Sequence, residues 1–256
     1  MSTHAIAVPP ATTQHHPPPR FVNAGFAPRF VPYEDGLALQ QRAVDRIAAG
    51  SDDGTVFLLE HEAVYTAGRR SDPEEYPSDG TPVVAVDRGG KVTWHGPGQL
   101  VAYPVIRLAA GWGVVDFVRA LEGVLIEVAA DFGVTGFRVP GRSGVWTQPE
   151  RTAPPAKLAQ IGLHASAGII THGIAINCSN DLTPFDSFVP CGITDAGVTT
   201  LSALAGRRIA PAEVAPALSG RIAPLLSECA APAGAGPRHN AAPTAPHGPH
   251  HTEYTA

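Results

Sequence analysis

Short stretches of alternating apolar and polar residues recur along the chain and predict a β-sheet. The strongest strand-like runs lie at residues 55–60, 82–87, 101–108, 134–139, 144–147, 157–165 and 169–178. We expect the run at 82–87 to be a buried strand and residues 20–32 to be extended. The runs at 157–165 and 169–178 are separated by a short polar and glycine segment, which predicts a β-hairpin. Residues 61–70 have polar ends and a glycine, so they predict a loop that leaves the sheet.

A helical period appears in three other parts of the chain. Residues 34–49 place Leu37, Val44, Ile47 and Ala48 on one face, and Gly50 ends the helix. Asp116 is expected to cap a helix that runs to about residue 132. A short helix should follow Thr199.

The last predicted helix begins at Pro211, and we expect Pro216 and Pro224 to kink or interrupt it. Because the predicted strands come in adjacent groups between helices, the pattern indicates an α+β (α/β) fold, with a mixed sheet packed against helices.

Both ends of the chain differ in composition from its middle. Residues 1–19 contain five prolines, three histidines and no charged side chain, and residues 230–256 are mostly Ala, Pro, Gly and His. Such segments bury too little apolar surface to fold, so we expect disordered tails at 1–19 and 230–256. A single domain is predicted over 20–229, with an exposed Pro-rich loop at 148–155. No function is inferred for the tails or for this loop.

The overall composition narrows the functional class. The formal net charge is −5 and no basic run occurs, which argues against nucleic-acid binding. No apolar run reaches the length of a membrane span and no signal-peptide pattern begins the chain, so we expect no membrane contact and a cytoplasmic protein. Three cysteines at 178, 191 and 229 fit neither a disulfide framework nor a zinc spacing. We therefore expect no metal and no cofactor.

The stretch from Arg88 to Pro104, Arg-Gly-Gly-Lys-Val-Thr-Trp-His-Gly-Pro-Gly-Gln-Leu-Val-Ala-Tyr-Pro, combines glycines with polar side chains. One interpretation is a tight hairpin around a buried His95. The other is a site where glycines let the backbone approach a ligand, and the polar residues favour it. The stretch is not a nucleotide motif, because Gly96-Pro-Gly98 lacks the third glycine of a dinucleotide fingerprint and Val92 stands where a P-loop needs Ser or Thr.

Two residues further along the chain suggest covalent chemistry. Only two of the 18 Lys and Arg residues are lysines, Lys91 and Lys157, and lysine can cycle a proton where arginine cannot. Cys191 lies between Pro190 and Gly192 in a predicted loop, a setting that can present a nucleophile. A cysteine needs a nearby base or cation to become a thiolate. The available partners are Lys157, His61, His95, His164 and His172, and their spacing does not decide among them.

The stretch from Arg88 to Pro104 resembles a signature of the lipoyl(octanoyl) transferases. Further motifs of that family follow in the same order: Lys157-Leu-Ala-Gln-Ile-Gly162, His172-Gly-Ile-Ala-Ile-Asn177 and Pro190-Cys-Gly-Ile193. An earlier one matches residues 61–69. The resemblance covers roughly residues 30–205, and together the motifs are highly specific.

The resemblance implies a fold, a reaction and a site. The fold is that of the catalytic domain of biotin and lipoate protein ligases. The reaction moves an octanoyl group from octanoyl-acyl carrier protein to a lysine of lipoyl domains, in 2-oxoacid dehydrogenase E2 subunits and the glycine-cleavage H protein. By resemblance Cys191 carries the acyl group as a thioester and Lys157 is the acid/base. The implied substrate-binding residues are Arg88, Gly89, Gly90, Lys91, Val92, Thr93, Trp94, His95, Gln160, Ile161, Gly162, Gly173, Ile174 and Ala175.

Other interpretations of the sequence remain open. An ATP-dependent lipoate or biotin protein ligase of the same fold would use the lysine but needs no cysteine nucleophile. A non-enzymatic acyl- or protein-binding module would bind without covalent transfer. We expect a monomer, and Arg69, Arg70 and Arg142 are the cations considered for docking the acidic carrier protein. Lys91 is equally explained as a surface residue, and His95 either orders the Cys–Lys pair or packs beneath it.

Overall fold

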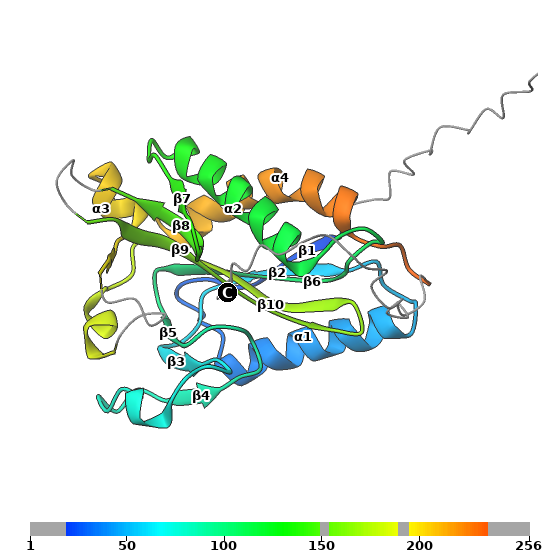
Figure 1. Ribbon diagram of the computed structural model, residues 1–256, viewed down its shortest axis with the longest axis horizontal. Helices are drawn as coiled ribbons and strands as arrows, with labels where there is room; N and C mark the ends of the chain where they lie inside the picture. The colour runs from blue at the N-terminus through cyan, green and yellow to red at the C-terminus, as the bar shows by residue number, and fades with distance from the viewer. Residues whose placement is uncertain (1–18, 149–153, 189–194, 235–256) are drawn as a thin grey trace, which may run out of the picture.

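A mixed β-sheet forms the centre of the computed structural model, which describes residues 19–148, 154–188 and 195–234 (Figure 1). The strand order is β1-β2-β6-β10-β9-β8-β7, and β11 pairs with β9. The β1–β2 and β9–β11 pairs are parallel and the others are antiparallel. The strands are β1 (Arg20–Gly25), β2 (Thr55–Leu59), β6 (Gln99–Arg107), β7 (Phe137–Val139), β8 (Arg142–Thr147), β9 (Ala156–Ser166), β10 (Ile169–Asn177) and β11 (Gly197–Val198).

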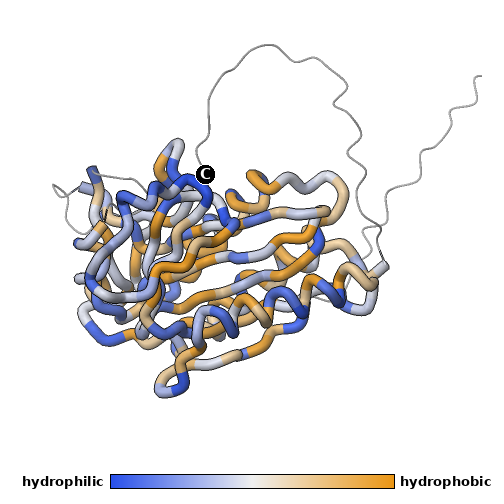
Figure 2. The backbone as a smooth tube through the Cα atoms, turned by 90° about the horizontal axis from the view of Figure 1, so that it is seen from below, coloured by the Kyte–Doolittle hydropathy of each residue, from blue (hydrophilic) through white to orange (hydrophobic). Residues whose placement is uncertain are grey.

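Helices cover both faces of this sheet (Figure 1). On one face lie α2 (Val114–Asp131) and α4 (Pro211–Cys229), and on the other lies α1 (Tyr33–Ala48). Strand β6 shows why both faces are apolar: Leu100, Ala102 and Ile106 belong to the core under α2 and α4, whereas Val101 and Tyr103 belong to the core under α1. The strands accordingly carry long hydrophobic stretches and the loops are more hydrophilic (Figure 2). The predicted mixed sheet packed with helices is confirmed, as is the hairpin of β9 and β10.

A second, smaller sheet was not expected from the sequence. It has the order β4-β3-β5, with β3 (Val64–Ala67), β4 (Val83–Ala85) and β5 (Val92–His95). The prediction of a loop over 61–70 is therefore wrong, because its centre is the buried strand β3. The run at 82–87 is also not a buried strand, since only residues 83–85 pair and they sit at a sheet edge, partly exposed. Short 3₁₀ turns lie nearby at η1 (Pro73–Glu75) and η2 (Thr183–Ser187).

The Gly-Pro-Gly turn joins the two sheets rather than closing a hairpin. Strand β5 before the turn pairs with β3 in the small sheet, and β6 after it pairs with β2 and β10 in the large one. Gly98 has a φ of +87°, and a Cβ there would lie 2.5 Å from the backbone nitrogen of Asn180. Only glycine fits such an approach, so this turn fixes where the small sheet meets the large one.

Two helix predictions need correction in detail. The buried face of α1 is Gly36, Gln40, Ala43 and Ile47, so it is rotated from the predicted one and includes a polar residue. Helix α2 begins earlier than predicted, with Gly113 as N-cap, and the Asp116 side chain accepts a hydrogen bond from the Gly113 N–H at 3.2 Å. Asp116 thus stabilises the helix start from the first turn instead of capping it. The short helix α3 (Leu201–Ala205) follows Thr200, whose side chain caps it.

Helix α4 is not interrupted by its internal prolines. It runs without a break from Pro211 to Cys229. Pro216 and Pro224 are both exposed, so the carbonyls that lose their N–H partners face water, which can hydrate them. Tertiary packing of the apolar face, including Leu218 and Leu226, outweighs the local cost.

The packed chain extends slightly beyond the predicted domain at both ends. Pro19 is buried. Ala230 bridges to Leu108, and the Ala231 N–H donates to the Arg107 carbonyl at 2.7 Å. The packed part of the chain therefore extends past residue 230, because the backbone of Ala230 and Ala231 pairs with the end of β6. The remaining predicted tail residues and most of the Pro-rich loop lie outside the described residues.

Candidate active site

A cavity of about 650 Å³ lies where the two sheets and the start of α1 meet. Its walls come from α1, β5, β6, β9, β10, the glycine-rich segment before β5 and the turn before β8. Residues distant in sequence meet here. The lining consists of Tyr33, Arg70, Arg88, Gly89, Gly90, Lys91, Thr93, His95, Val101, Tyr103, Gly141, Arg142, Ser143, Lys157, Gln160, Ile161, Gly162, His172, Gly173, Ile174, Ala175 and Asp195.

Most residues that the sequence singled out for substrate binding line this cavity, and two do not. Val92 and Trp94 alternate with Thr93 and His95 along β5, so their side chains point the opposite way, into a separate apolar cluster with Phe185. The prediction that Val92 and Trp94 contact substrate is not supported by this placement.

Ile161 and Ile174 line the cavity, but their side chains belong to the core on the opposite face of the large sheet or pack against it. They therefore contribute mainly strand backbone to the cavity wall.

Lys157 and Gln160 reach the same cavity through a β-bulge in β9. The register of β8 against β9 shifts between the pairs Val145–Ala159 and Trp146–Lys157, which makes Leu158 an extra residue. Leu158 and Ala159 both face the large core, whereas Lys157 and Gln160 both line the cavity. Without the bulge, strand alternation would place residues 157 and 160 on opposite faces.

The Lys157 side chain is held over an aromatic ring. Lys157 is only 5% exposed, and its Nζ lies 4.8 Å from the centre of the Trp146 ring. Among the residues that the structure describes, no hydrogen bond or ion pair engages this nitrogen. The Lys157 nitrogen is thus positioned by a cation–π contact, in a side chain that lines the cavity.

Glycines make this arrangement possible at two places. Gly144 has a φ of +105°, and a Cβ on it would lie 2.4 Å from the Ala159 carbonyl oxygen, so a side chain there would collide with the bulge. Gly173 would place a Cβ 2.1 Å from the Ala102 carbonyl oxygen. Both positions need the close backbone approach that glycine permits.

Arg88 fixes the glycine-rich segment to the small sheet. Its Nη1 donates to the carbonyls of Gly89 and Lys91 at 2.9 and 3.0 Å. Its Nη2 donates to the carbonyl and hydroxyl of Thr66 at 2.7 and 2.8 Å. Arg88 is buried, so this side chain shapes the cavity wall and also brings a positive charge to it.

His95 is held in one tautomer by a chain of hydrogen bonds. Gln99 Nε2 donates to the Trp94 carbonyl and to Asn177 Oδ1, so Gln99 Oε1 is the acceptor that faces His95. His95 Nδ1 therefore donates to that oxygen at 2.7 Å, which leaves Nε2 as the acceptor of the neutral ring. Burial lowers the pKa of His95 to about 3, and the repulsion that would arise if both His95 and His61 were protonated acts in the same direction.

A second chain of hydrogen bonds lies behind the cavity wall. His61 Nδ1 donates to the Val31 carbonyl at 2.8 Å, so His61 Nε2 accepts from the Tyr103 hydroxyl at 2.7 Å. Burial lowers the pKa of His61 to about 4 and raises the pKa of Tyr103 well above its ordinary value. His61 is neutral and lies behind Tyr103, which lines the cavity, so it supports the wall and is not itself part of the lining.

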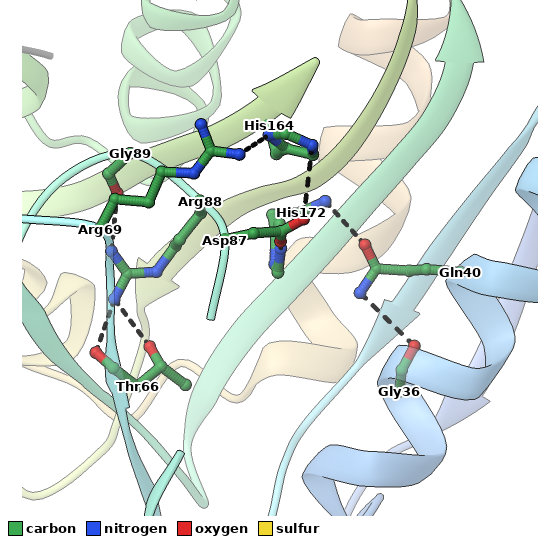
Figure 3. A network of polar contacts seen from close by, with 9 residues as sticks. All are labelled: Gly36, Gln40, Thr66, Arg69, Asp87, Arg88, Gly89, His164 and His172. Carbon is green, nitrogen blue, oxygen red and sulfur yellow. Dashed lines mark hydrogen bonds and ion pairs between the residues drawn. The ribbon is translucent and has the colours of Figure 1, made fainter. Parts of the chain in front are cut away.

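His172 stands at one edge of the cavity in an unusual backbone conformation, with a φ of +57°. Its N–H donates to Gln40 Oε1 at 2.7 Å, and its Nε2 contacts Asp87 Oδ1 at 2.7 Å (Figure 3). The strand opposite carries Pro104, which has no N–H, and the β6–β10 ladder is unpaired between Ile170 and Ile174. In this unpaired stretch, Gln40 from α1 accepts the hydrogen bond of the His172 N–H.

Asp87 connects His172 to the molecular surface. His164 Nε2 lies 3.4 Å from Asp87 Oδ2, and Arg69 Nη2 lies 3.1 Å from His164 Nδ1 (Figure 3). Burial alone would raise the pKa of Asp87, but the His172 hydrogen bond and the charges of both histidines hold it below its ordinary value. Burial lowers the pKa of His172. His172 and Arg69 also line a second cavity of about 530 Å³ beside the first.

The cavity rim carries two ion pairs. Arg142 Nη2 lies 2.7 Å from both carboxylate oxygens of Asp195. Lys91 Nζ lies 2.8 Å from Glu75 Oε1. Lys91 is thus a rim residue in a half-exposed surface pair, in line with its interpretation as a surface residue.

Two of the three cysteines, Cys178 and Cys229, lie in the described part of the chain. Cys178 and Cys229 are fully buried, and burial raises the pKa of each thiol to about 12. Both are inert apolar side chains, as expected from their positions. Cys191 lies outside the described residues.

Sequence reasoning missed several lining residues. Tyr33 lies at the first turn of a helix, Gly141 lies in the turn before β8, and Ser143 lies at the start of β8. Tyr33 gives no local signal, because a tyrosine at a helix start is equally suited to the surface. For Gly141 and Ser143, the glycine just before a predicted strand that contains Trp146 was the available hint.

Within the described part of the chain, no helix is long and apolar enough to cross a bilayer. In the same residues, no group of three or more His, Cys, Asp or Glu side chains gathers as a metal site would.

Comparison with known proteins identifies the relatives of this chain. The family model of the lipoyl protein ligase A/B catalytic domain matches residues 32–223. An octanoyltransferase of Arthrobacter sp. (strain FB24) is 52% identical over 195 residues, which cover 76% of this chain and 88% of that protein. An octanoyltransferase of Leifsonia xyli subsp. xyli is 48% identical, with 83% and 95% covered.

Solved structures show the same fold at much lower identity. A bipartite lipoate protein ligase from Thermoplasma acidophilum superposes with a TM-score of 0.60 at 13% identity, covering 82% of this chain and 84% of that one. A lipoate-protein ligase A bound with ATP also gives 0.60, at 15% identity, covering 82% and 85%. The chain belongs to the lipoyl protein ligase A/B catalytic domain family, as an acyltransferase of its octanoyltransferase group.

Proposed function

We propose that this protein transfers an octanoyl group from octanoyl-acyl carrier protein to a lysine of lipoyl domains, through a thioester on Cys191. The transfer is the first step of endogenous protein lipoylation, and the acceptors are 2-oxoacid dehydrogenase E2 subunits and the glycine-cleavage H protein. The observation that carries the proposal is the buried Lys157, which the β9 bulge turns into the cavity. The octanoyltransferase relatives favour this reaction over the ATP-dependent ligase.

The proposed reaction has two steps that balance without a metal or nucleotide. In the first, the Cys191 thiolate attacks the donor thioester, a new C–S bond forms, and the carrier thiolate leaves and is protonated. In the second, the acceptor amine attacks the acyl-enzyme, the C–S bond breaks, and one amine proton is passed to the Cys191 sulfur. Lys157 takes and returns these protons, a role that needs a group able to cycle between charged and neutral forms.

The order of residues supports placing Cys191 beside Lys157. Cys191 precedes Asp195 by four residues, and four residues of chain span at most about 14 Å. Asp195 lines the cavity, and two residues later β11 pairs with β9 at Ala156 and Lys157. The cysteine segment is therefore tethered to the strand that carries the proposed acid/base.

The cavity lining suits an acyl thioester. Val101 and Ala175 offer apolar surface for methylenes, each of which gains about 0.8 kcal/mol on burial. Backbone of the segment 88–91 is exposed to the cavity beside them. Of the cations considered for the acidic carrier, Arg70 and Arg142 line the cavity, whereas Arg69 contacts His164 beside the second cavity.

Mass spectrometry of the intact protein tests the proposal. Incubation with octanoyl-acyl carrier protein should add one octanoyl group at Cys191. Cys229→Ala should label like the parent, because Cys229 is buried, and Cys191→Ala should not label. A Cys191→Ala protein that still acquires an octanoyl group on cysteine would overturn the thioester route.

The acid/base role of Lys157 has its own test. Lys157→Arg keeps the positive charge but should lose turnover to acceptor lipoyl domain by several orders of magnitude. Turnover within a few-fold of the parent would show that charge alone is sufficient.

A further inference from the structure

Four aromatic rings gather at one end of the cavity, and three of them line it. Tyr33, His95 and Tyr103 are in the lining, and His61 lies behind Tyr103. The ring centre of His61 lies 5.1 Å from that of Tyr33 and 5.8 Å from that of Tyr103, and the rings of Tyr33 and His95 are within 6° of parallel. Burial raises the pKa of Tyr33 to about 12, and it keeps both histidines neutral near pH 7. This end of the cavity is therefore an uncharged aromatic wall, which suits an alkyl chain.

The Tyr103 ring is held from behind by packed protein. Its hydroxyl donates to His61 Nε2 at 2.7 Å, and the other nitrogen of His61 donates to the Val31 carbonyl at 2.8 Å. A Cβ on Gly36 of α1 would lie only 2.7 Å from His61 Cε1 and 3.6 Å from Tyr103 Cε2. Helix α1 thus packs directly against both rings. Tyr103 has no space to retreat when a ligand presses on it.

The register of the large sheet gives the distance from this wall to Lys157. Val101 of β6 is paired with Ala175 of β10, and Ala175 is paired with Gln160 of β9. Both β6 and β9 run antiparallel to β10, so they run in the same direction. Lys157 lies three residues before Gln160, and Tyr103 lies two residues after Val101, which makes five residues along the sheet and two strands across it. At about 3.3 Å per residue and about 4.8 Å per strand, the Cα atoms of Lys157 and Tyr103 are about 19 Å apart.

An octanoyl chain matches the space between these two ends. Its seven carbon–carbon bonds of about 1.5 Å span about 9 Å in the extended form. The side chains of Lys157 and Tyr103 both line the cavity, so they fill much of the remaining distance. Between them the floor of the cavity is apolar, at Val101 and Ala175.

We propose that Tyr103 and Tyr33 form the closed end of the acyl cavity and determine the length of the acyl group that the enzyme transfers. This inference rests on the proposed function, which places the acyl carbonyl at Lys157. The alkyl tail then runs over Val101 and Ala175 and ends against the two rings. Each buried methylene favours binding by about fourfold, so an open channel would prefer acyl groups longer than octanoyl. A wall that cannot move instead turns the added methylenes of a longer chain into a steric clash.

A competition experiment measures the chain-length preference directly. Octanoyl- and decanoyl-acyl carrier protein are supplied together at equal concentration, and the intact mass of the lipoyl domain gives the ratio of decanoyl to octanoyl product. Tyr103→Val removes the ring with a side chain that suits a strand. The ratio should rise by about tenfold, as expected for two newly accommodated methylenes. Tyr103→Phe keeps the ring and should keep the parent ratio. Because the ratio compares two donors on one enzyme, a general loss of activity does not change it.

The matched control is Phe57→Val. Phe57 is the cross-strand partner of Tyr103 and belongs to the same core, but it is not among the residues that line the cavity. Phe57→Val should lower the melting temperature, as a buried large-to-small change does, and leave the product ratio unchanged. Tyr33→Leu removes the other ring of the wall at the start of α1, where leucine suits a helix. It should also raise the ratio, and it serves as the test if Tyr103→Val does not fold.

Two outcomes would overturn the assignment while the proposed function stands. One is a product ratio within about twofold of the parent in the folded variants among Tyr103→Val and Tyr33→Leu. The other is a rise of the same size in Phe57→Val, which would mean that loosening of the core sets the chain length. If the parent forms no octanoyl-lysine on the lipoyl domain, the proposed function itself fails.

Discussion

The Nζ of Lys157 lies 4.8 Å from the centre of the Trp146 ring, and the two residues are cross-strand partners on β9 and β8. On the same ring system, the Arg142 guanidinium lies 5.7 Å away. The buried indole therefore positions the proposed acid/base by its face, and no acceptor in the described part of the chain binds the Lys157 nitrogen.

Replacing this ring should impair turnover through Lys157. Trp146→Leu removes a cation–π contact worth about 0.5–2 kcal/mol, so octanoyl transfer should fall by roughly tenfold. Trp146→Phe keeps an aromatic face and should retain more activity than Trp146→Leu at equal melting temperature. Steady-state rates with lipoyl domain check this, and equal losses in both variants would mean that Trp146 acts only by filling volume.

The glycine beside the bulge should be intolerant of a side chain. Gly144→Ala would place a Cβ 2.4 Å from the Ala159 carbonyl oxygen at a φ of +105°. Gly141→Ala also has positive φ, at +76°, but no atom lies within 4 Å of its Cβ. Gly141→Ala should therefore cost about 1–2 kcal/mol of unfolding free energy from backbone strain alone, and Gly144→Ala clearly more. Urea unfolding of the two variants measures the difference, and equal costs would contradict the collision.

The hydrogen bond from the His172 N–H to Gln40 should stabilise the fold. Gln40→Met leaves this buried N–H without its acceptor, so the unfolding free energy should fall by about 1–3 kcal/mol. Gln41→Met, one residue along the helix on an exposed side chain, should stay within about 0.5 kcal/mol of the parent. Chemical denaturation of both variants measures this difference. If Gln40→Met is as stable as Gln41→Met, another group accepts the hydrogen bond of the His172 N–H.

Stability should fall as the pH drops below the ordinary histidine pKa. Burial holds the pKa of His95 at about 3 and that of His61 at about 4 in the folded protein, against 6.5 when unfolded. Between pH 6.5 and 4 the unfolded chain therefore binds protons that the folded chain does not. Each histidine should contribute a loss of up to about 1.4 kcal/mol per pH unit, and His172, with its lowered pKa, acts in the same direction.

The measurement is unfolding free energy against pH, for the parent and for His95→Gln. The variant should show a shallower slope in this window, whatever its absolute stability. An unchanged slope would mean that His95 is protonated in the folded protein.

Much of the fold could be predicted because its main signals are local. The β9–β10 hairpin and helices α1 and α2 follow from apolar periodicity and from glycines at their ends. The assembly of the segments around residues 88, 160 and 173 was expected from their resemblance to family motifs, and the structure brings them to one cavity.

The predictions fail where the structure of a segment depends on which strand, far away in sequence, it pairs with. Strand β3 is short and bordered by polar residues, so only its pairing with β4 and β5 reveals it, and the same pairing places the expected strand at 82–87 at an exposed sheet edge. Val92 and Trp94 look like cavity residues until β5 is assigned to the small sheet, which turns them away from it.

The bulge at Leu158 could not be foreseen for a related reason. The segment Lys157-Leu-Ala-Gln160 places two apolar residues between two polar ones, but only the pairing of β9 with β8 shows that Leu158 is the extra residue and that Lys157 and Gln160 share a face. Similarly, the positive φ of His172 falls where the β6–β10 ladder is unpaired opposite Pro104, a residue far away in sequence.

The turn that joins the two sheets has a consequence for how substrate size could evolve or be engineered. The Gly98 N–H donates to Glu60 at 2.7 Å, and its carbonyl accepts from Cys178 and Ser179, which anchors the turn to the large sheet. The distance between the opposing walls of the cavity is thus a property of this joint as much as of the lining side chains. A small shift of this turn would move the small sheet relative to the large one and change the spacing of the cavity walls, without altering any residue that lines the cavity.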